Sequence, residues 1–171
     1  MSRILWFVLG LVFGIAALFA GGYVFVRGGG VSMAVSARPL PLEKRVAHMA
    51  LRASIGPAAA RSNPLPLNEQ NLLEGAMTYA DHCTVCHCAP DKPRTAISKW
   101  LFPDPPGLFE RKEMVTDDPD GTIYWKVSNG IRLSGMPGFE KTLSEQQRWQ
   151  VTMLCKHADR ISPAVRSALQ R

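Results

Sequence analysis

The chain has 171 residues, of which 46% are hydrophobic and 20% are charged. This composition excludes an intrinsically disordered protein and a collagen-like one, because those chains are poor in apolar residues or built on glycine repeats. The formal net charge of +6 is confined to residues 1–61, since residues 62–171 contain 13 basic and 13 acidic residues. Nucleic-acid binding needs a basic surface on the folded domain, so nucleic acid is not an expected partner.

Residues 4–26 form an uncharged, apolar segment of 23 residues flanked by Arg3 and Arg27. At 1.5 Å per residue a helix of this length spans about 34 Å, which is enough to cross a bilayer. The segment therefore predicts a membrane anchor over residues 1–27. A cleaved signal peptide is the alternative, because small residues follow at Ser32-Met33-Ala34, although the apolar region of a signal peptide usually has only about 7–15 residues.

Residues 28–67 are predicted to form a basic tether. They begin with three consecutive glycines, which favour flexibility, and they contain one predicted helix, Leu42–Ile55. The apolar residues of that helix fall on one side and its basic residues on another. Two interpretations stay open: the helix lies on anionic lipid headgroups, or it is a spacer that is solvated or docked on the domain.

A Cys-x-x-Cys-His motif at Cys83, Cys86 and His87 indicates the chemistry most clearly. Two thiols at this spacing can form thioethers with the two vinyl groups of one haem, and the adjacent imidazole then becomes an iron ligand. A thioredoxin-like dithiol would need a βαβ context that the sequence lacks. A zinc site would need a second ligand pair at short spacing, whereas Cys155 and His157 are distant and in reversed order.

Two helices are expected to enclose the cofactor. The first runs from about Glu69 to His82 after an Asn68 N-cap, and the second begins after a capping box at Ser144–Gln147. Gly75 costs the first helix about 1 kcal/mol relative to alanine. This cost predicts a close approach of the second helix, with Trp149 packed over Gly75.

Met136 is the predicted second axial ligand of the iron, since thioether sulfur is a common partner of histidine in low-spin haem. It lies among glycines and a proline in residues 130–139, where the backbone can approach a cofactor and no helix hides the side chain. Met77 and Met153 fall within the two helices and are better explained as core residues. Met114 follows a charged run and is expected to be partly exposed.

Together these features resemble a class I c-type cytochrome over about residues 67–160. The resemblance rests on the Cys-Thr-Val-Cys-His motif, the preceding helix with Gly75 and Tyr79, the Gly-Met-Pro-Gly loop and the Trp149 helix. It implies an all-α fold of three to five helices around one covalently bound haem c. The cytochrome domain is expected over residues 68–171.

Further residues are candidates for the cofactor site. Members of this family hold the proximal histidine through the carbonyl of a proline in a Pro-x-Leu context, and Pro106 matches that position. Such a bond fixes the imidazole ring and raises its basicity. Tyr79 shares a helix face with Cys83, and Trp125 is either a core aromatic or a donor to a haem propionate. Cys88 departs from the family, which usually has a small residue there.

Cys155 lies on an apolar helix stripe and is predicted to be a small buried side chain. A disulfide between Cys88 and Cys155 is an open alternative if the compartment is oxidising. Residues 88–120 contain six prolines and few helix signals, so a long loop is expected there. Such a loop is unusual in a compact domain, and the resemblance accounts for it because a haem would supply the apolar core.

One-electron transfer is the function that the resemblance implies, with no small organic substrate. Haem attachment in this family occurs outside the cytoplasmic membrane, which implies a single-pass protein of a bacterial inner membrane with a periplasmic haem domain. Flanking charge alone mildly favours the opposite topology. The expected partner is a membrane redox complex of the respiratory chain. Two alternatives stay open: a haem sensor or peroxidase-like enzyme with a displaceable Met136, and a fixed subunit of a larger membrane complex.

Overall fold

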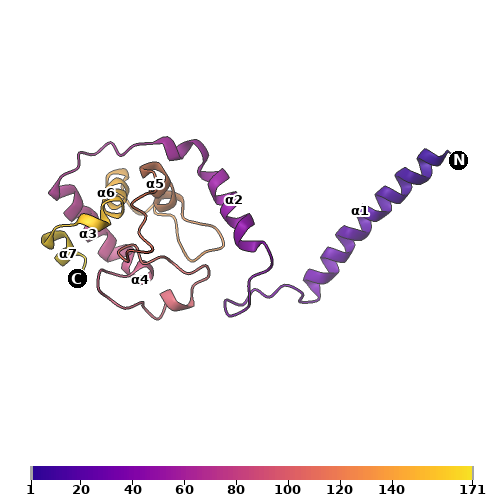
Figure 1. The fold of residues 1–171 in the computed structure, drawn as a ribbon, viewed down its shortest axis with the longest axis horizontal. Helices are drawn as coiled ribbons and strands as arrows, with labels where there is room; N and C mark the ends of the chain where they lie inside the picture. Colours follow the sequence, from indigo (N-terminus) through magenta and orange to yellow (C-terminus); the bar gives the residue numbers. More distant parts are fainter. Residues whose placement is uncertain (1, 171) are drawn as a thin grey trace. The chain divides into compact units, whose positions relative to one another are not determined.

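The computed structural model describes residues 2–170, and that range contains helices and loops but no β-strand. Met1 and Arg171, which end the predicted anchor and the predicted haem domain, lie outside the described residues. The all-α fold is confirmed, and within the described range seven helices follow residue 67, of which five are α-helices and two are 3₁₀ helices. Figure 1 shows their arrangement. The helices are α1 (Arg3–Arg27), α2 (Glu43–Ile55), η1 (Gly56–Ala60), α3 (Glu69–His82), α4 (Thr84–His87), η2 (Ser98–Trp100), α5 (Asp120–Asn129), α6 (Glu145–Lys156), η3 (Ala158–Arg160) and α7 (Pro163–Ala168), where η denotes a 3₁₀ helix.

Contacts divide the chain into two compact units, Met1–Lys44 and Arg45–Arg171. The first unit contains α1, a helix of 25 residues with no buried side chain. Within residues 2–170 it is the one helix long and apolar enough to cross a membrane, and a signal sequence would meet the same criteria. The predicted apolar helix is therefore present.

Local capping signals fix the ends of the helices in the second unit. The Asn68 side chain accepts a hydrogen bond from the Asn71 backbone N–H at 2.8 Å, and α3 then has the predicted bounds. Ser144 and Gln147 form the predicted capping box at the start of α6. Ser162 caps α7 in the same way as Asn68 caps α3. Each cap satisfies a backbone N–H that the first helical turn would otherwise leave unpaired.

The packing of α3 against α6 confirms the close approach that was predicted at Gly75. A Cβ atom on this residue would collide with the carbonyl oxygen of Gln150 and would lie 2.8 Å from its carbonyl carbon. The predicted neighbour is wrong, however, because Trp149 instead stacks on Tyr124 with ring centroids 3.9 Å apart. Side chains of successive residues on a helix differ in direction by about 100°. The Trp149 side chain therefore points toward Tyr124, and the backbone of Gln150 covers Gly75.

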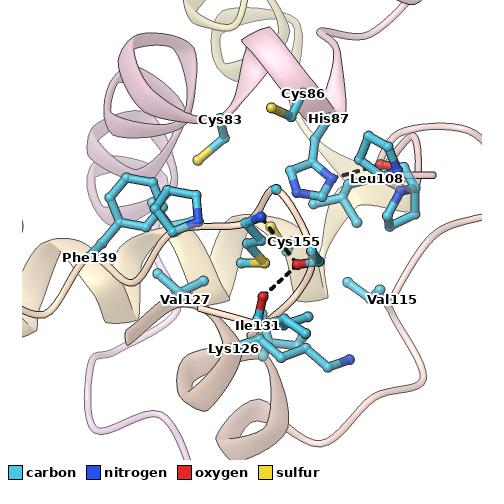
Figure 2. Close-up of a pocket in the computed structure, with 18 of the residues that line it drawn as sticks. Cys83, Cys86, His87, Leu108, Val115, Lys126, Val127, Ile131, Phe139 and Cys155 are labelled. Atoms are coloured by element: carbon cyan, nitrogen blue, oxygen red, sulfur yellow. Dashed lines mark hydrogen bonds between the residues drawn. The ribbon is translucent and has the colours of Figure 1, made fainter. Parts of the chain in front are cut away.

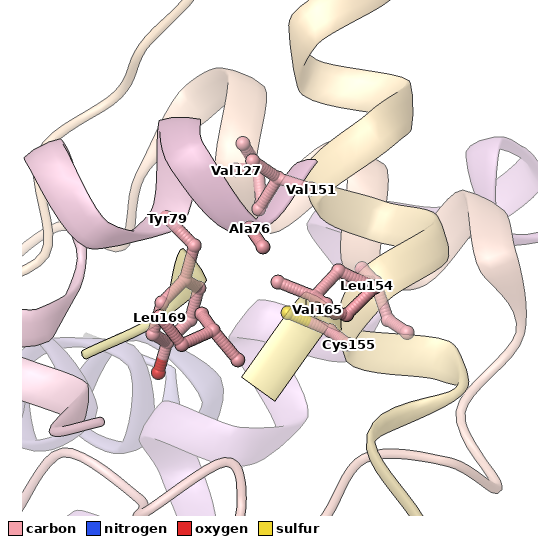
Figure 3. Close-up of a cluster of buried hydrophobic side chains, with 9 residues drawn as sticks. Ala76, Tyr79, Val127, Val151, Leu154, Cys155, Val165 and Leu169 are labelled. Atoms are coloured by element: carbon pink, nitrogen blue, oxygen red, sulfur yellow. The ribbon is translucent and has the colours of Figure 1, made fainter. Parts of the chain in front are cut away.

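Side chains from α3, α5, α6 and α7 form one apolar cluster beside this crossing (Figure 3). Removing side chains of this size from water contributes roughly 1.5–3 kcal/mol each for Val, Leu or Ile. Cys155 is 2% exposed, which confirms the predicted small buried side chain, and no disulfide joins it to Cys88 in this structure. The buried cluster consists of Ala76, Tyr79, Ile123, Val127, Val151, Leu154, Cys155, Val165 and Leu169.

The 3₁₀ helix η1 packs directly on α5, although its residues were predicted to belong to a tether. Gly121 of α5 allows this contact: a Cβ there would lie 2.9 Å from the carbonyl oxygens of Ala59 and Arg61 and would collide with that of Ala58. Because Gly121 has no side chain, the backbones of η1 and α5 can lie in direct contact.

Asn63 fastens the next part of the same segment to the domain. Its side-chain amide donates to the carbonyl oxygen of Trp149 at 2.9 Å, and its backbone N–H donates to the Asp120 carboxylate at 3.1 Å. The second compact unit accordingly begins at Arg45. The structure thus differs from the predicted boundary, because the folded domain starts well before residue 68.

Candidate cofactor site

A largely apolar cavity lies in the second unit among α3, α4, α5, α6 and the loops between them (Figure 2). It holds about 1220 Å³ of space free of protein atoms, part of which is open to solvent. Its lining includes Leu51, Tyr79, Cys83, Cys86, His87, Leu101, Pro106, Leu108, Val115, Asp118, Ile123, Lys126, Val127, Ile131, Met136, Phe139 and Cys155.

The short helix α4 brings the two motif cysteines and the histidine to the same wall of the cavity (Figure 2). The N–H groups of Cys86 and His87 both donate to the carbonyl of Cys83, at 3.1 and 2.9 Å. Residues three and four apart share a helix face, so this single turn directs all three side chains into one space. The spacing of the motif and the geometry of α4 therefore agree.

The pKa values of the Cys83 and Cys86 thiols bear on whether these two residues could form a reactive dithiol. Burial, with a smaller effect of Cys86, raises the pKa of the Cys83 thiol to about 12. Burial, followed by the neighbouring Cys88, also raises the pKa of Cys86. A reactive dithiol has a lowered pKa, so these cysteines do not have the character of a thioredoxin-like centre. Within residues 2–170 no group of three His, Cys, Asp or Glu side chains converges as a zinc site would require.

His87 is held by the carbonyl of Pro106, the residue predicted to contact it. The His87 Nδ1–H donates to the Pro106 oxygen at 2.8 Å. This bond occupies Nδ1 and leaves Nε2 as the free ligating atom. Burial lowers the pKa of His87, and the hydrogen bond to Pro106 opposes this effect in part. A lowered pKa favours the neutral imidazole, which is the form that binds a metal ion.

Met136 lines the same cavity and is fixed by the loop that follows α5. Its carbonyl accepts the Ile131 N–H at 3.1 Å, and its own N–H donates to the Ser134 hydroxyl at 3.2 Å. Gly130 has a φ of 69°, a left-handed conformation that glycine adopts without strain. In Figure 2 Ile131 lies across the cavity from His87. The loop thus holds the backbone of Met136 next to the wall opposite the histidine.

Tyr79 lies in the cavity wall beneath α4 and is fully buried. Its hydroxyl donates to the carbonyl of Cys88 at 3.0 Å, and burial raises its pKa far above the usual range. Tyr79 therefore stays a neutral donor that ties α3 to the residue after the motif. Cys88 itself has φ 62° and ψ 162°, a conformation found almost only for glycine and costing about 1–3 kcal/mol. This geometry favours glycine at this position.

Cys88→Gly is expected to retain haem and to leave the free energy of unfolding unchanged or higher. The relief of roughly 1–3 kcal/mol of backbone strain offsets the loss of one small buried side chain. Cys155→Gly is the matched control, since Cys155 is equally buried but lies in α6, where glycine costs about 1 kcal/mol in helix propensity alone. Denaturant unfolding of the two variants measures the difference, and equal destabilisation would contradict the strain at Cys88.

Trp125 is not brought to the cavity. α5 presents Ile123, Lys126 and Val127 to it, three positions that share one helix face. Trp125 points elsewhere and lines a separate surface hollow with Arg148. The structure therefore does not support Trp125 as a donor to a haem propionate.

Lys126 and Leu51 line the cavity but were missed from the sequence. The Lys126 ammonium lies 2.9 Å from a carboxylate oxygen of Asp118, which also lines the cavity. The sequence feature that could have identified Lys126 is its spacing of three residues from Ile123, which puts both on one helix face. Leu51 comes from α2, and its spacing of four residues from the buried Ile55 indicated a packed face. Of the two interpretations of this helix, docking on the domain agrees with both residues.

Residues 70–153 match the family described as cytochrome C oxidase, cbb3-type, subunit III. The matched region takes in nearly all of α3, then α4, α5, the Met136 loop and most of α6. No match was found among curated proteins. The cavity fits a haem, because its wall is mostly apolar and carries the Cys83 and Cys86 thiols beside the His87 imidazole. On this combination of site and family match, residues 70–153 form a c-type cytochrome domain of class I, a kind of domain that binds haem c covalently.

Proposed function

We propose that this chain is a membrane-anchored, monohaem c-type cytochrome that carries single electrons to or from a respiratory-chain complex. The observation that carries the proposal is the presence in one chain of a c-type cytochrome domain and a 25-residue apolar helix, α1, with no buried side chain. The exposed apolar surface of α1 suits a nonpolar surrounding such as the bilayer core. An electron carrier with such an anchor would work at the membrane surface.

In this proposal each residue of the cavity has a separate task. Cys83 and Cys86 would hold the haem through thioethers, and His87 and Met136 would be the protein ligands of its iron. Pro106 fixes the His87 ring through the hydrogen bond at Nδ1 and increases its basicity. When bound, haem supplies an iron that alternates between the ferric and ferrous states. The apolar walls exclude water, which favours the ferrous state because it carries less charge.

The anchor gives the carrier its route to a partner. Residues 62–171 have no net charge, so long-range electrostatic steering of a charged partner is weak. Confinement of donor and acceptor to one membrane raises their effective concentration instead. We propose that the N-terminus lies in the cytoplasm and the haem domain in the periplasm, because haem attachment in c-type cytochromes implies this topology. The partner proposed is an integral redox complex of that membrane.

Release of the domain from the membrane tests the proposal. The chain from Arg45 onward, exported behind a cleavable signal, keeps the whole second unit and is expected to keep its spectrum and potential. Its oxidation by membranes should fall by about tenfold or more at equal haem concentration. Fusion of the same domain to an unrelated single-span helix is the matched control and should restore the rate. An undiminished rate for the released domain would count against an anchor that serves electron transfer.

A fixed subunit of a larger complex is the second candidate, favoured by the description of the matched family as subunit III of a cbb3-type oxidase. Extraction of native membranes with a mild detergent separates the two candidates. A fixed subunit would elute with an oxidase in constant stoichiometry after size-exclusion chromatography. A carrier would elute alone, and the oxidase would retain its other subunits.

A further inference from the structure

α2 meets the cofactor cavity although it lies outside the residues matched by the cytochrome family, which begin at residue 70. Leu51 is half-buried and lines the cavity together with the motif residues of α4. Ile55, one turn further along α2, is 7% exposed. Side chains four residues apart lie on the same helix face, so one face of α2 packs toward the domain.

The C-terminal end of α2 is joined directly to a packed segment. Ile55 has helical dihedral angles, φ −66° and ψ −47°, but Gly56 has a φ of 43°, so α2 ends at Ile55 and η1 begins at the next residue. η1 is pressed on Gly121 of α5, which has no room for a Cβ atom beneath the carbonyls of Ala58 and Ala59. Ile55 lies only three residues before Ala58, so the C-terminal end of α2 is tied to this contact.

The opposite face of α2 makes no comparable contact. Val46 and Met49 are 54% and 66% exposed, and the helical period places them on the far side from Leu51. The large apolar residues of α2 thus divide into one inward pair, Leu51 and Ile55, and one outward pair, Val46 and Met49. In a solvated spacer helix, both pairs would be exposed to the same extent.

We infer that α2 is a wall of the haem pocket, and that Leu51 shields the cofactor from water on the side that the family-matched residues leave open. The inference rests on haem c occupying this cavity. A more apolar and less hydrated pocket disfavours the more highly charged ferric state, so removal of the Leu51 side chain lowers the reduction potential. Leu51 is in this sense a binding residue contributed by the segment that links the domain to α1.

Leu51→Ala and Leu51→Met in the full chain, purified in detergent, test the inference against Met49→Ala. Met49→Ala removes a large apolar side chain from the exposed face of the same helix. At a fixed applied potential near the midpoint, Leu51→Ala should reduce the ratio of ferrous to ferric protein several-fold. Its haem should also react several-fold faster with a small hydrophilic reductant. Leu51→Met and Met49→Ala should both behave as the unmodified chain.

Equal behaviour of Leu51→Ala and Met49→Ala would overturn the inference, because α2 would then be a spacer. A second readout applies even if the potentials are close. Trypsin cleavage after Arg52, which is exposed on α2, requires local unfolding of a docked helix. Cleavage should be slow in the unmodified chain and several-fold faster in Leu51→Asn, and rapid cleavage of the unmodified chain would also overturn the inference. Loss of haem from the unmodified chain would instead contradict the cofactor assignment itself.

Discussion

Met136→Ala is expected to remove the low-spin, six-coordinate iron spectrum and to lower the reduction potential. A thioether ligand stabilises ferrous iron more than ferric iron, so its loss favours the oxidised state. The loop around Met136 is closed by hydrogen bonds that involve its backbone N–H and carbonyl. These bonds persist in the variant, and the fold should survive. Redox titration and the near-infrared absorption band of iron–thioether ligation in the oxidised protein measure the change.

Met114→Ala is the matched control for this prediction. Met114 is also half-buried in a loop, but it does not line the cavity. The near-infrared band and the potential should be unchanged in this variant. If the band persisted in Met136→Ala and was lost in Met114→Ala, the iron ligand would be Met114 instead of Met136.

Gly75→Val is expected to destabilise the domain by about 3 kcal/mol. The Cβ atom would meet the backbone of Gln150, and a backbone cannot move aside as the end of a flexible side chain can. The helices α3 and α6 would have to separate, and the apolar cluster around Leu154 would lose contacts. Denaturant unfolding followed by circular dichroism measures the loss.

Asp81→Ala provides the control for Gly75→Val. Asp81 is exposed on the same helix, and its replacement should change the free energy of unfolding by no more than about 0.5 kcal/mol. Equal stabilities of Gly75→Val and Asp81→Ala would mean that α3 and α6 do not pack through Gly75.

Features encoded by neighbouring residues were predictable from the sequence. Asn68 and Ser144 cap helices through hydrogen bonds to residues three positions away, so a short stretch of sequence contains the whole interaction. Cys83 and Cys86 are likewise brought to one wall by a single helical turn. The contact between His87 and Pro106 spans 19 positions and came from the family resemblance rather than from local pattern.

Features decided by tertiary packing were predicted less well. Most residues of α5 around Trp125 are apolar or amphipathic, so the sequence does not show which face of the helix meets the cavity. A shift of one residue turns a side chain by about 100°. The prediction therefore chose Trp125, whereas its neighbour Lys126 lines the cavity. The docking of residues 56–63 depends on Gly121 and on hydrogen bonds from Asn63 to distant residues. Neither produces a periodic signal near residue 60, where prolines and basic residues suggested a tether.

Mass spectrometry of the protein purified from membranes most directly tests the central claim that Cys83 and Cys86 hold one haem. The intact chain should carry the mass of one haem after acidified organic solvent has removed any noncovalent cofactor. Trypsin does not cleave between Lys92 and Pro93, so the haem should be found on the peptide Ser62–Arg94. Within that peptide Cys88 should remain open to alkylation. Extraction of the haem by the solvent, or an alkylated Cys83 or Cys86 beside a blocked Cys88, would contradict the account.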